Sequence, residues 1–85
     1  MYLEHEFEHV VNHDGHPIAV IEGRAIFHVW GLIEFDWKIS ELWLRDTDSR
    51  ELFKLDLNSP LGQEIMTWLY ANKADYIEEK ILEAA

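Results

Sequence analysis

The most constraining feature of the sequence is a run of aromatic and aliphatic residues in its middle. The stretch 25–45, AIFHVWGLIEFDWKISELWLR, holds three of the four tryptophans and two of the four phenylalanines. On both sides of Gly31 its apolar residues alternate with polar ones, which predicts two adjacent β-strands joined by a tight turn. Large aromatic side chains are mostly buried, so we expect this stretch to form the middle of a sheet and of the core.

The length of the whole chain is enough for one domain. With 85 residues and 48% apolar residues, it can build a single core without cross-links. It has no cysteine, which excludes disulfides, thiolate metal sites and thiol nucleophiles and favours a cytosolic setting. We predict a single domain over residues 1–85, with a β-sheet in residues 1–58 and helices in residues 59–85.

Residues 2–12 predict the first strand. Glutamates occupy even positions, whereas apolar residues and histidines occupy odd ones, and this period of two is typical of a strand with one solvated face. The spacing of His5, His9 and His13 by four also fits a helix. The β-branched pair at 10–11 and the turn signal at 12–15 favour the strand.

Three further strands complete the predicted sheet. Residues 17–30 form the second, in which Gly23 suggests a bulge or bend. In the third, Ile33, Phe35, Trp37 and Ile39 share one face, and a phase shift at 40–41 predicts a bulge that turns Leu42 and Leu44 inward and Trp43 away. After a polar turn at 46–49, residues 50–57 return with Phe53, Leu55 and Leu57 inward. Short connections make the expected sheet an antiparallel meander, and the fold class α+β.

The C-terminal residues predict two helices. Ser59 is a suitable N-cap with Pro60 at the first helical position. The first helix should pack on the sheet through a stripe of apolar residues: Leu61, Ile65, Trp68 and Leu69. Ile77 and Ile81 lie off that stripe, so we expect a break at 72–75, with Asn72 in the left-handed conformation and a capping box formed by Asp75 and Glu78.

The charge restricts the possible partners. Seventeen acids against seven bases give a net charge of -10, and residues 1–36 carry seven acids but only one base. Such a chain repels nucleic acid and anionic membranes, so we expect a basic protein surface as its partner. Residues 1–10 do not resemble a signal peptide and no apolar run is long enough to span a bilayer, so we expect a cytoplasmic protein.

The five histidines all lie at or before position 28. On a strand, His5 and His9 stand ~13 Å apart and cannot share one ion, so we predict no metal site there. His13, Asp14 and His16 remain possible ligands of a weak surface site. A pH response is an alternative: with half-exposed histidines whose pKa values are raised by nearby glutamates, full protonation would change the net charge from -10 to -5.

Sequence motifs of catalysis are missing. The chain contains no glycine-rich phosphate loop, dinucleotide fingerprint or catalytic serine motif. We therefore expect neither an enzyme nor a cofactor.

The acidic strand face is the candidate binding surface. Glu4, Glu6 and Glu8 should repeat at about 6.6 to 6.8 Å on one side of the first strand, which is similar to the step between successive phosphates of a nucleic acid. Glu22, Glu34 and Asp36 on neighbouring strands would extend this face. Trp43, out of phase with its neighbours, and Tyr70 are the aromatic residues expected to contribute to an interface.

The C-terminal half also resembles a known group of proteins. The segment ISELWLRDTDSRELFKLDL, followed by a helix and the ending IEEKILEAA, is similar to small, acidic, uncharacterised α+β proteins encoded by bacteriophages and prophages. The resemblance covers residues 33–85 and rests on pattern. It implies an accessory role, such as inhibition of a host restriction or CRISPR complex.

Together these observations predict a non-catalytic acidic binding protein that engages a basic protein surface, as a phage-type inhibitor or a nucleic-acid mimic. The first alternative is a homo-oligomeric structural or accessory protein that associates through exposed aromatic residues. A metal- or pH-responsive module is a further alternative.

Overall fold

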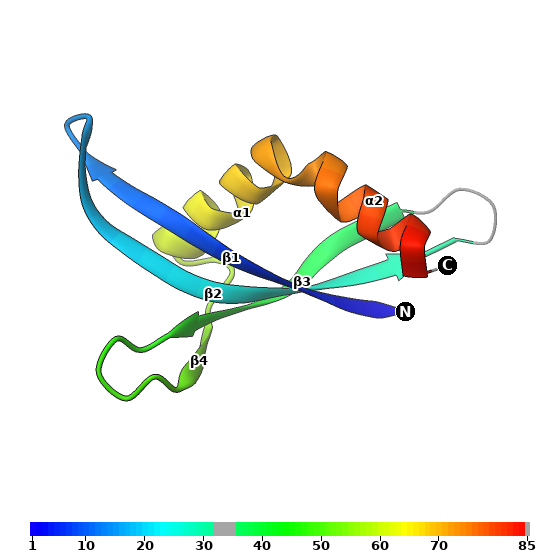
Figure 1. Ribbon diagram of the computed structural model, residues 1–85, viewed down its shortest axis with the longest axis horizontal. Coiled ribbons are helices and arrows are strands. Elements are labelled where there is room, and N and C mark those ends of the chain that lie inside the picture. Colours follow the sequence, from blue (N-terminus) through cyan, green and yellow to red (C-terminus); the bar gives the residue numbers. More distant parts are fainter. Residues whose placement is uncertain (32–35, 85) are drawn as a thin grey trace.

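Four antiparallel strands and two C-terminal helices make up the described part of the chain, residues 1–31 and 36–84 of a computed structural model (Figure 1). The elements follow in the order β1 (Tyr2–His13), β2 (His16–Trp30), β3 (Asp36–Arg45), β4 (Leu52–Leu55), α1 (Pro60–Asn72) and α2 (Ala74–Ala84). The strands pair in chain order, β1-β2-β3-β4. The predicted α+β fold, with a meander packed against C-terminal helices, is confirmed.

The first hairpin forms as the alternation and the turn signal predict. β1 pairs with β2 over its whole length, and Asp14 and Gly15 connect them with φ angles of 50° and 79°. Two consecutive residues with positive φ form the turn type whose twist matches paired strands. The helical alternative for the N-terminus is therefore wrong.

The predicted bulge in β3 is present at Ser40. Glu41 lies opposite Ile26 and Ile39 lies opposite Phe27, so Ser40 is the extra residue in the ladder. Its hydroxyl donates a hydrogen bond of 3.0 Å to the carbonyl of Ile26. Because of this extra residue, Ile39 and Leu42 are both buried on the inner face.

Of the two roles predicted for Gly23, a bulge or a bend, the bulge is absent. The register shifts involving β2 lie between Val11 and Asn12 and between Ile26 and Phe27. A Cβ atom on Gly23 would lie 2.5 Å from the carbonyl oxygen of Trp43 and 2.6 Å from the ring of Phe7. Glycine is required here because the neighbouring strand and side chain approach too closely for any other residue.

β4 is shorter than the predicted strand at 50–57. Arg50 adopts a φ of 62°, which delays the start of the strand. Asp56 ends it, because its carboxylate accepts a hydrogen bond of 2.9 Å from the N–H of Asn58 and its carbonyl accepts one from the N–H of Ser59. Phe53 lies opposite the buried Leu44 and therefore on the inner face, as predicted, but it is 47% exposed. The predicted positions Ile33 and Phe35 lie outside the described residues.

The two helices begin and end close to the predicted positions, but the break has a different geometry. Ser59 caps α1 by accepting a hydrogen bond of 3.1 Å from the N–H of Gly62. Lys73 is the C-cap with a φ of -121°, and Asn72 is not left-handed. α2 begins at Ala74, so Asp75 lies in its first turn and not at an N-cap.

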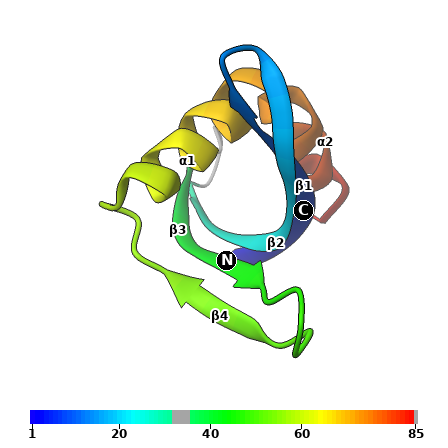
Figure 2. The ribbon, with the colours of Figure 1, turned by 90° about the vertical axis from the view of Figure 1, so that its left-hand side faces the viewer.

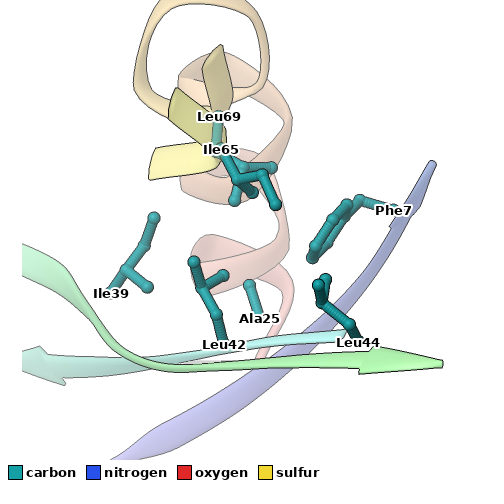
Figure 3. Close-up of a cluster of buried hydrophobic side chains, with 7 residues drawn as sticks. All are labelled: Phe7, Ala25, Ile39, Leu42, Leu44, Ile65 and Leu69. Carbon is teal, nitrogen blue, oxygen red and sulfur yellow. The ribbon is translucent and has the colours of Figure 1, made fainter. Parts of the chain in front are cut away.

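The helices cover one face of the curved sheet, and the core lies between them (Figures 2 and 3). The predicted stripe of α1 points into this core, with Ile65 and Leu69 fully buried and Leu61 and Trp68 partly buried. α2 contributes Ile77 and Ile81 to a second cluster. The first cluster consists of Phe7, Ala25, Ile39, Leu42, Leu44, Ile65 and Leu69.

Candidate partner-binding surface

The face of the sheet that the helices leave uncovered, here called the outer face, carries the predicted acidic residues. On β1, the odd-numbered His5, Phe7 and His9 are buried beneath the helices, so the even-numbered residues point outward. Glu4, Glu6 and Glu8 are therefore exposed in one row, as predicted. Glu22 lies directly opposite Glu8 on β2 and belongs to the same face.

The outer face also carries basic residues, which the sequence pattern did not assign to it. The register places six acidic and four basic side chains of the described residues there: Glu4, Glu6, Glu8, Glu22, Asp36 and Glu41, with Arg24, Lys38, Arg45 and Lys54. The predicted acidic face is thus a mixed one with a small negative excess.

Arg24 neutralises part of the β1 row. Its guanidinium lies 3.1 Å from the carboxylate of Glu6 and 3.8 Å from that of Glu4. Both carboxylates are well exposed, with Glu4 at 61% and Glu6 at 73% of their side-chain areas. Exposed pairs of this kind contribute about 0–1 kcal/mol each, so both glutamates can still interact with a further cation.

Two other carboxylates of the face are paired as well. Glu22 lies 3.1 Å from Arg50 and 3.9 Å from Arg45. The ammonium group of Lys54 on β4 pairs with the carboxylate of Glu41 on β3 at 3.2 Å. Among the described residues, Glu8 and Asp36 are the acids of the outer face without a basic partner within 4.0 Å.

Of the acidic residues predicted on the neighbouring strands, Glu34 lies outside the described residues. Asp36 is exposed and lies directly opposite Trp30 in the ladder between β2 and β3.

Trp43 points to the outer face, as the phase shift predicted. It is half-buried and, with Ile26 and Leu52, lines a shallow depression of ≈ 240 Å³ whose remaining wall is Glu4 and Arg24. Its indole N–H is buried and has no hydrogen-bond partner among the described residues. Trp43 thus forms part of the apolar floor of this depression on the outer face.

Tyr70 lies on the other side of the sheet and has a structural role. Its ring stacks on Trp37 with centroids 5.0 Å apart, and its hydroxyl accepts a hydrogen bond of 2.9 Å from the backbone N–H of Ile39. It is separated from the acidic row by the sheet itself, so the structure does not bring these predicted site residues together.

Two aromatic residues of the outer face were missed by sequence reasoning. Tyr2 and Trp30 are 66% and 44% exposed. The ring of His28 lies between them, stacked on Tyr2 at 4.8 Å and 5.5 Å from Trp30. Tyr2 has an even number like Glu4 on β1, and Trp30 has an even number like Arg24 on β2. This shared phase was the signal in the sequence that places both rings on the outer face.

Two of the histidines, His5 and His9, do not occupy the half-exposed positions expected of them, whereas His28 is half-buried. His5 and His9 are 7% and 6% exposed because the helices cover this face of β1. His9 bonds to the carboxylate of Glu64 at 3.1 Å, whereas the Nε2 atom of His5 has no partner among the described residues. Burial and the nearby Lys80 and Lys73 lower the pKa of His5, contrary to the predicted increase.

The exposed turn histidines also lack a complete ligand set. His13 lies opposite His16, and its ring lies 3.4 Å from Asp14. Within residues 1–31 and 36–84, no three histidine or acidic side chains are placed to hold one metal ion.

The comparisons with known proteins add no assignment, since no family model, curated protein or solved structure matches the chain. None of the described helices is long and apolar enough to cross a membrane.

Proposed function

We propose that this chain is a non-catalytic binding protein whose outer sheet face docks on a basic surface of a partner protein. The observation that carries the proposal is the composition of this face. It is uncovered by helices and presents a row of carboxylates at Glu4, Glu6 and Glu8 beside the exposed rings of Tyr2 and Trp30. Aromatic anchors surrounded by charged groups are typical of protein interfaces.

The two unpaired carboxylates indicate where a partner's cations would contribute most. Glu8 lies opposite Glu22, and two like charges in this position repel each other. Asp36 lies opposite Trp30, whose face can stack on a guanidinium. One lysine or arginine of the partner would relieve the repulsion between Glu8 and Glu22, and a second one would pair with Asp36.

The finer form of the proposal is an inhibitor that occupies the groove of a nucleic-acid-binding complex. The spacing of the β1 glutamates and the resemblance to phage-encoded proteins support it. The ion pairs of Arg24 reduce the similarity to a phosphate backbone. A basic protein surface of any kind is therefore the more general proposal.

The test compares two double variants with the same change in net charge. The immobilised protein is first used to capture basic proteins from a lysate of the source cells at ~50 mM salt. The affinity of the identified partner is then measured for the wild type, for E8Q/D36N on the outer face and for E78Q/E79Q on α2. We expect about tenfold weaker binding for E8Q/D36N, or about 1.4 kcal/mol, and wild-type binding for E78Q/E79Q.

The salt dependence and the oligomeric state decide the remaining outcomes. Raising the salt to ~200 mM should weaken binding of the wild type steeply. Equal losses in the two double variants would show that net charge, and not this face, drives binding. A dimer on size-exclusion chromatography that dissociates in W30A would replace the proposal by self-association through the aromatic residues.

A further inference from the structure

β1 is an edge strand, and its outward-pointing backbone groups belong to its even-numbered residues. Met1 and Val29 exchange two hydrogen bonds, of 2.8 and 3.1 Å, between their amino and carbonyl groups. In an antiparallel ladder such pairs alternate with pairs that are not hydrogen-bonded. The odd-numbered residues of β1 therefore bond to β2, and the N–H and C=O groups of the even-numbered ones point away from the sheet.

The contact between α2 and the edge agrees with this direction. The ammonium group of Lys80 donates a hydrogen bond to the carbonyl of Glu4, an even-numbered residue. In the described part of the chain, no strand pairs with this side of β1. Apart from the Glu4 carbonyl, which accepts from Lys80, the edge offers the backbone N–H and C=O groups of five residues in register: Tyr2, Glu4, Glu6, Glu8 and Val10.

The same even-numbered positions carry the carboxylates. Every second residue of a strand added at this edge would place its side chain on the outer face. Its Cβ atom would lie about 4.5 to 5.5 Å from the Cβ atom of Glu4, Glu6 or Glu8. Lysine or arginine at those positions would meet a carboxylate at each step. The remaining residues of the added strand would point to the helical side of the sheet.

On the helical side, the neighbourhood of the edge is aromatic. The ring of Tyr76, which is 55% exposed, lies 5.1 Å from that of His5. The ring of Trp68 lies 5.0 Å from that of His9. Apolar side chains of an added strand would extend the row of His5, Phe7 and His9 beside these rings.

The charge of the edge disfavours a second copy of this chain as the added strand. Antiparallel pairing of two β1 strands would bring glutamates of one copy next to glutamates of the other. Like charges at this distance are destabilising, and charged edges are a common protection against self-pairing.

We infer that β1 binds an extended segment of the partner protein as a fifth strand, in which lysine or arginine alternates with apolar residues. This inference rests on the proposed function and adds the conformation and the residue pattern of the partner. Backbone hydrogen bonds would supply affinity, and the alternating side chains would supply specificity.

Amide hydrogen exchange tests the backbone pairing directly. The probe is a seven-residue peptide of alternating lysine and valine, and the control is a peptide of the same composition with the lysines in one block. We expect the alternating peptide to slow exchange at Glu4, Glu6 and Glu8 by at least about fivefold, since a strand bond must open before exchange. The block peptide should slow none of them. Absence of this protection at millimolar alternating peptide overturns the inference.

A pair of variants at one position separates the backbone from the charge. Glu8→Gln and Glu8→Pro both remove the carboxylate, but only proline removes the outward N–H, and proline is tolerated where an edge N–H faces solvent. We expect Glu8→Pro to bind the alternating peptide about tenfold more weakly than Glu8→Gln. Equal affinities of the two variants, with the fold of each verified by circular dichroism, overturn the inference.

The outcomes also separate this inference from the proposed function. If both peptides bind and change the environment of the Trp30 ring without slowing hydrogen exchange of the even-numbered amides, the strand addition is wrong. Docking on the outer face then still stands. If the even-numbered amides are protected without peptide and the protein is a dimer, the edge is occupied by a second copy and the inference is wrong.

Discussion

His5 is an uncompensated polar group inside the molecule. Its ring packs against Tyr76, its Nε2 atom has no partner among the described residues, and Lys73 and Lys80 lie close enough to oppose its protonation. Burial is the main cause of its lowered pKa, and the lysines add to it. The imidazole is therefore neutral in the folded protein over a wider pH range than in the unfolded chain.

This difference makes stability depend on pH. The unfolded chain takes up the His5 proton near pH ~6.5, whereas the folded protein takes it up only at lower pH. The contribution of His5 is thus complete above the unfolded pKa and is lost as the pH falls through it towards the folded pKa. We expect urea denaturation to give a lower free energy of unfolding at pH ~5.5 than at pH ~7.5, with a smaller difference in His5→Phe.

The exposed His16 provides the control for this prediction. His16→Gln should keep the pH dependence of the wild type, because the side chain lies in solvent in both states. His9, which bonds to Glu64, is present in all three proteins and does not affect the comparison. Identical pH dependence in His5→Phe and the wild type would contradict the prediction.

At the level of elements, the bulge in β3 is connected to α1 through one hydroxyl group. Ser40 interrupts the regular ladder, and the adjacent N–H of Ile39 donates to Tyr70 on α1. Trp37 stacks on the same tyrosine ring. This contact fixes the position of the helix relative to the irregular part of the strand.

Tyr70→Phe tests this connection. Removal of the hydroxyl leaves the Ile39 N–H without its acceptor, and we expect a loss of about 1 to 2 kcal/mol in the free energy of unfolding. Tyr76→Phe is the matched control on α2, where the tyrosine is 55% exposed, and should change stability by less than about 0.5 kcal/mol. Equal stabilities of the two variants by urea denaturation would show that water replaces the hydroxyl.

At the scale of the whole molecule, most of the negative charge lies away from the candidate surface. The acids of the outer face are largely balanced by bases, whereas the turn at 46–51 carries three acids against Arg50 and helix α2 carries four against Lys80. These acids are Asp46, Asp48, Glu51, Asp75, Glu78, Glu79 and Glu83. In the turn, the N–H groups of Ser49 and Asp48 hydrogen-bond the carboxylate of Asp46 and lower its pKa.

A net charge of -10 on 85 residues should destabilise the folded state by self-repulsion. We expect the melting temperature to rise by a few degrees when sodium chloride is increased from ~50 to ~300 mM, because screening weakens this repulsion more than it weakens the exposed ion pairs. Circular dichroism at 222 nm measures it. A decrease would indicate that the ion pairs of Arg24, Arg45, Arg50 and Lys54 outweigh the repulsion.

The local patterns of the sequence were sufficient for the fold. The alternation in β1, the turn at Asp14 and Gly15, the phase shift at Ser40 and the cap at Ser59 each depend on neighbouring residues. Strand periodicity and cap chemistry act over a few residues, so they can be recognised in the sequence without knowledge of the tertiary contacts. The end of β4 just before Asp56 and the geometry after Asn72 were less predictable, because several local hydrogen-bonding solutions compete there.

The tertiary structure decided what the strands present. Cross-strand register placed Arg24 beside Glu4 and Glu6, and with Arg45 and Arg50 beside Glu22 it turned a predicted acidic face into a mixed one. Helix packing buried His5 and His9, although their alternation resembles that of half-exposed residues. The sequence determined which residues share a face of β1. Only pairing and packing decided which face is covered and that no described strand pairs with the outer edge of β1, because these depend on residues as far apart as Glu4 and Lys80.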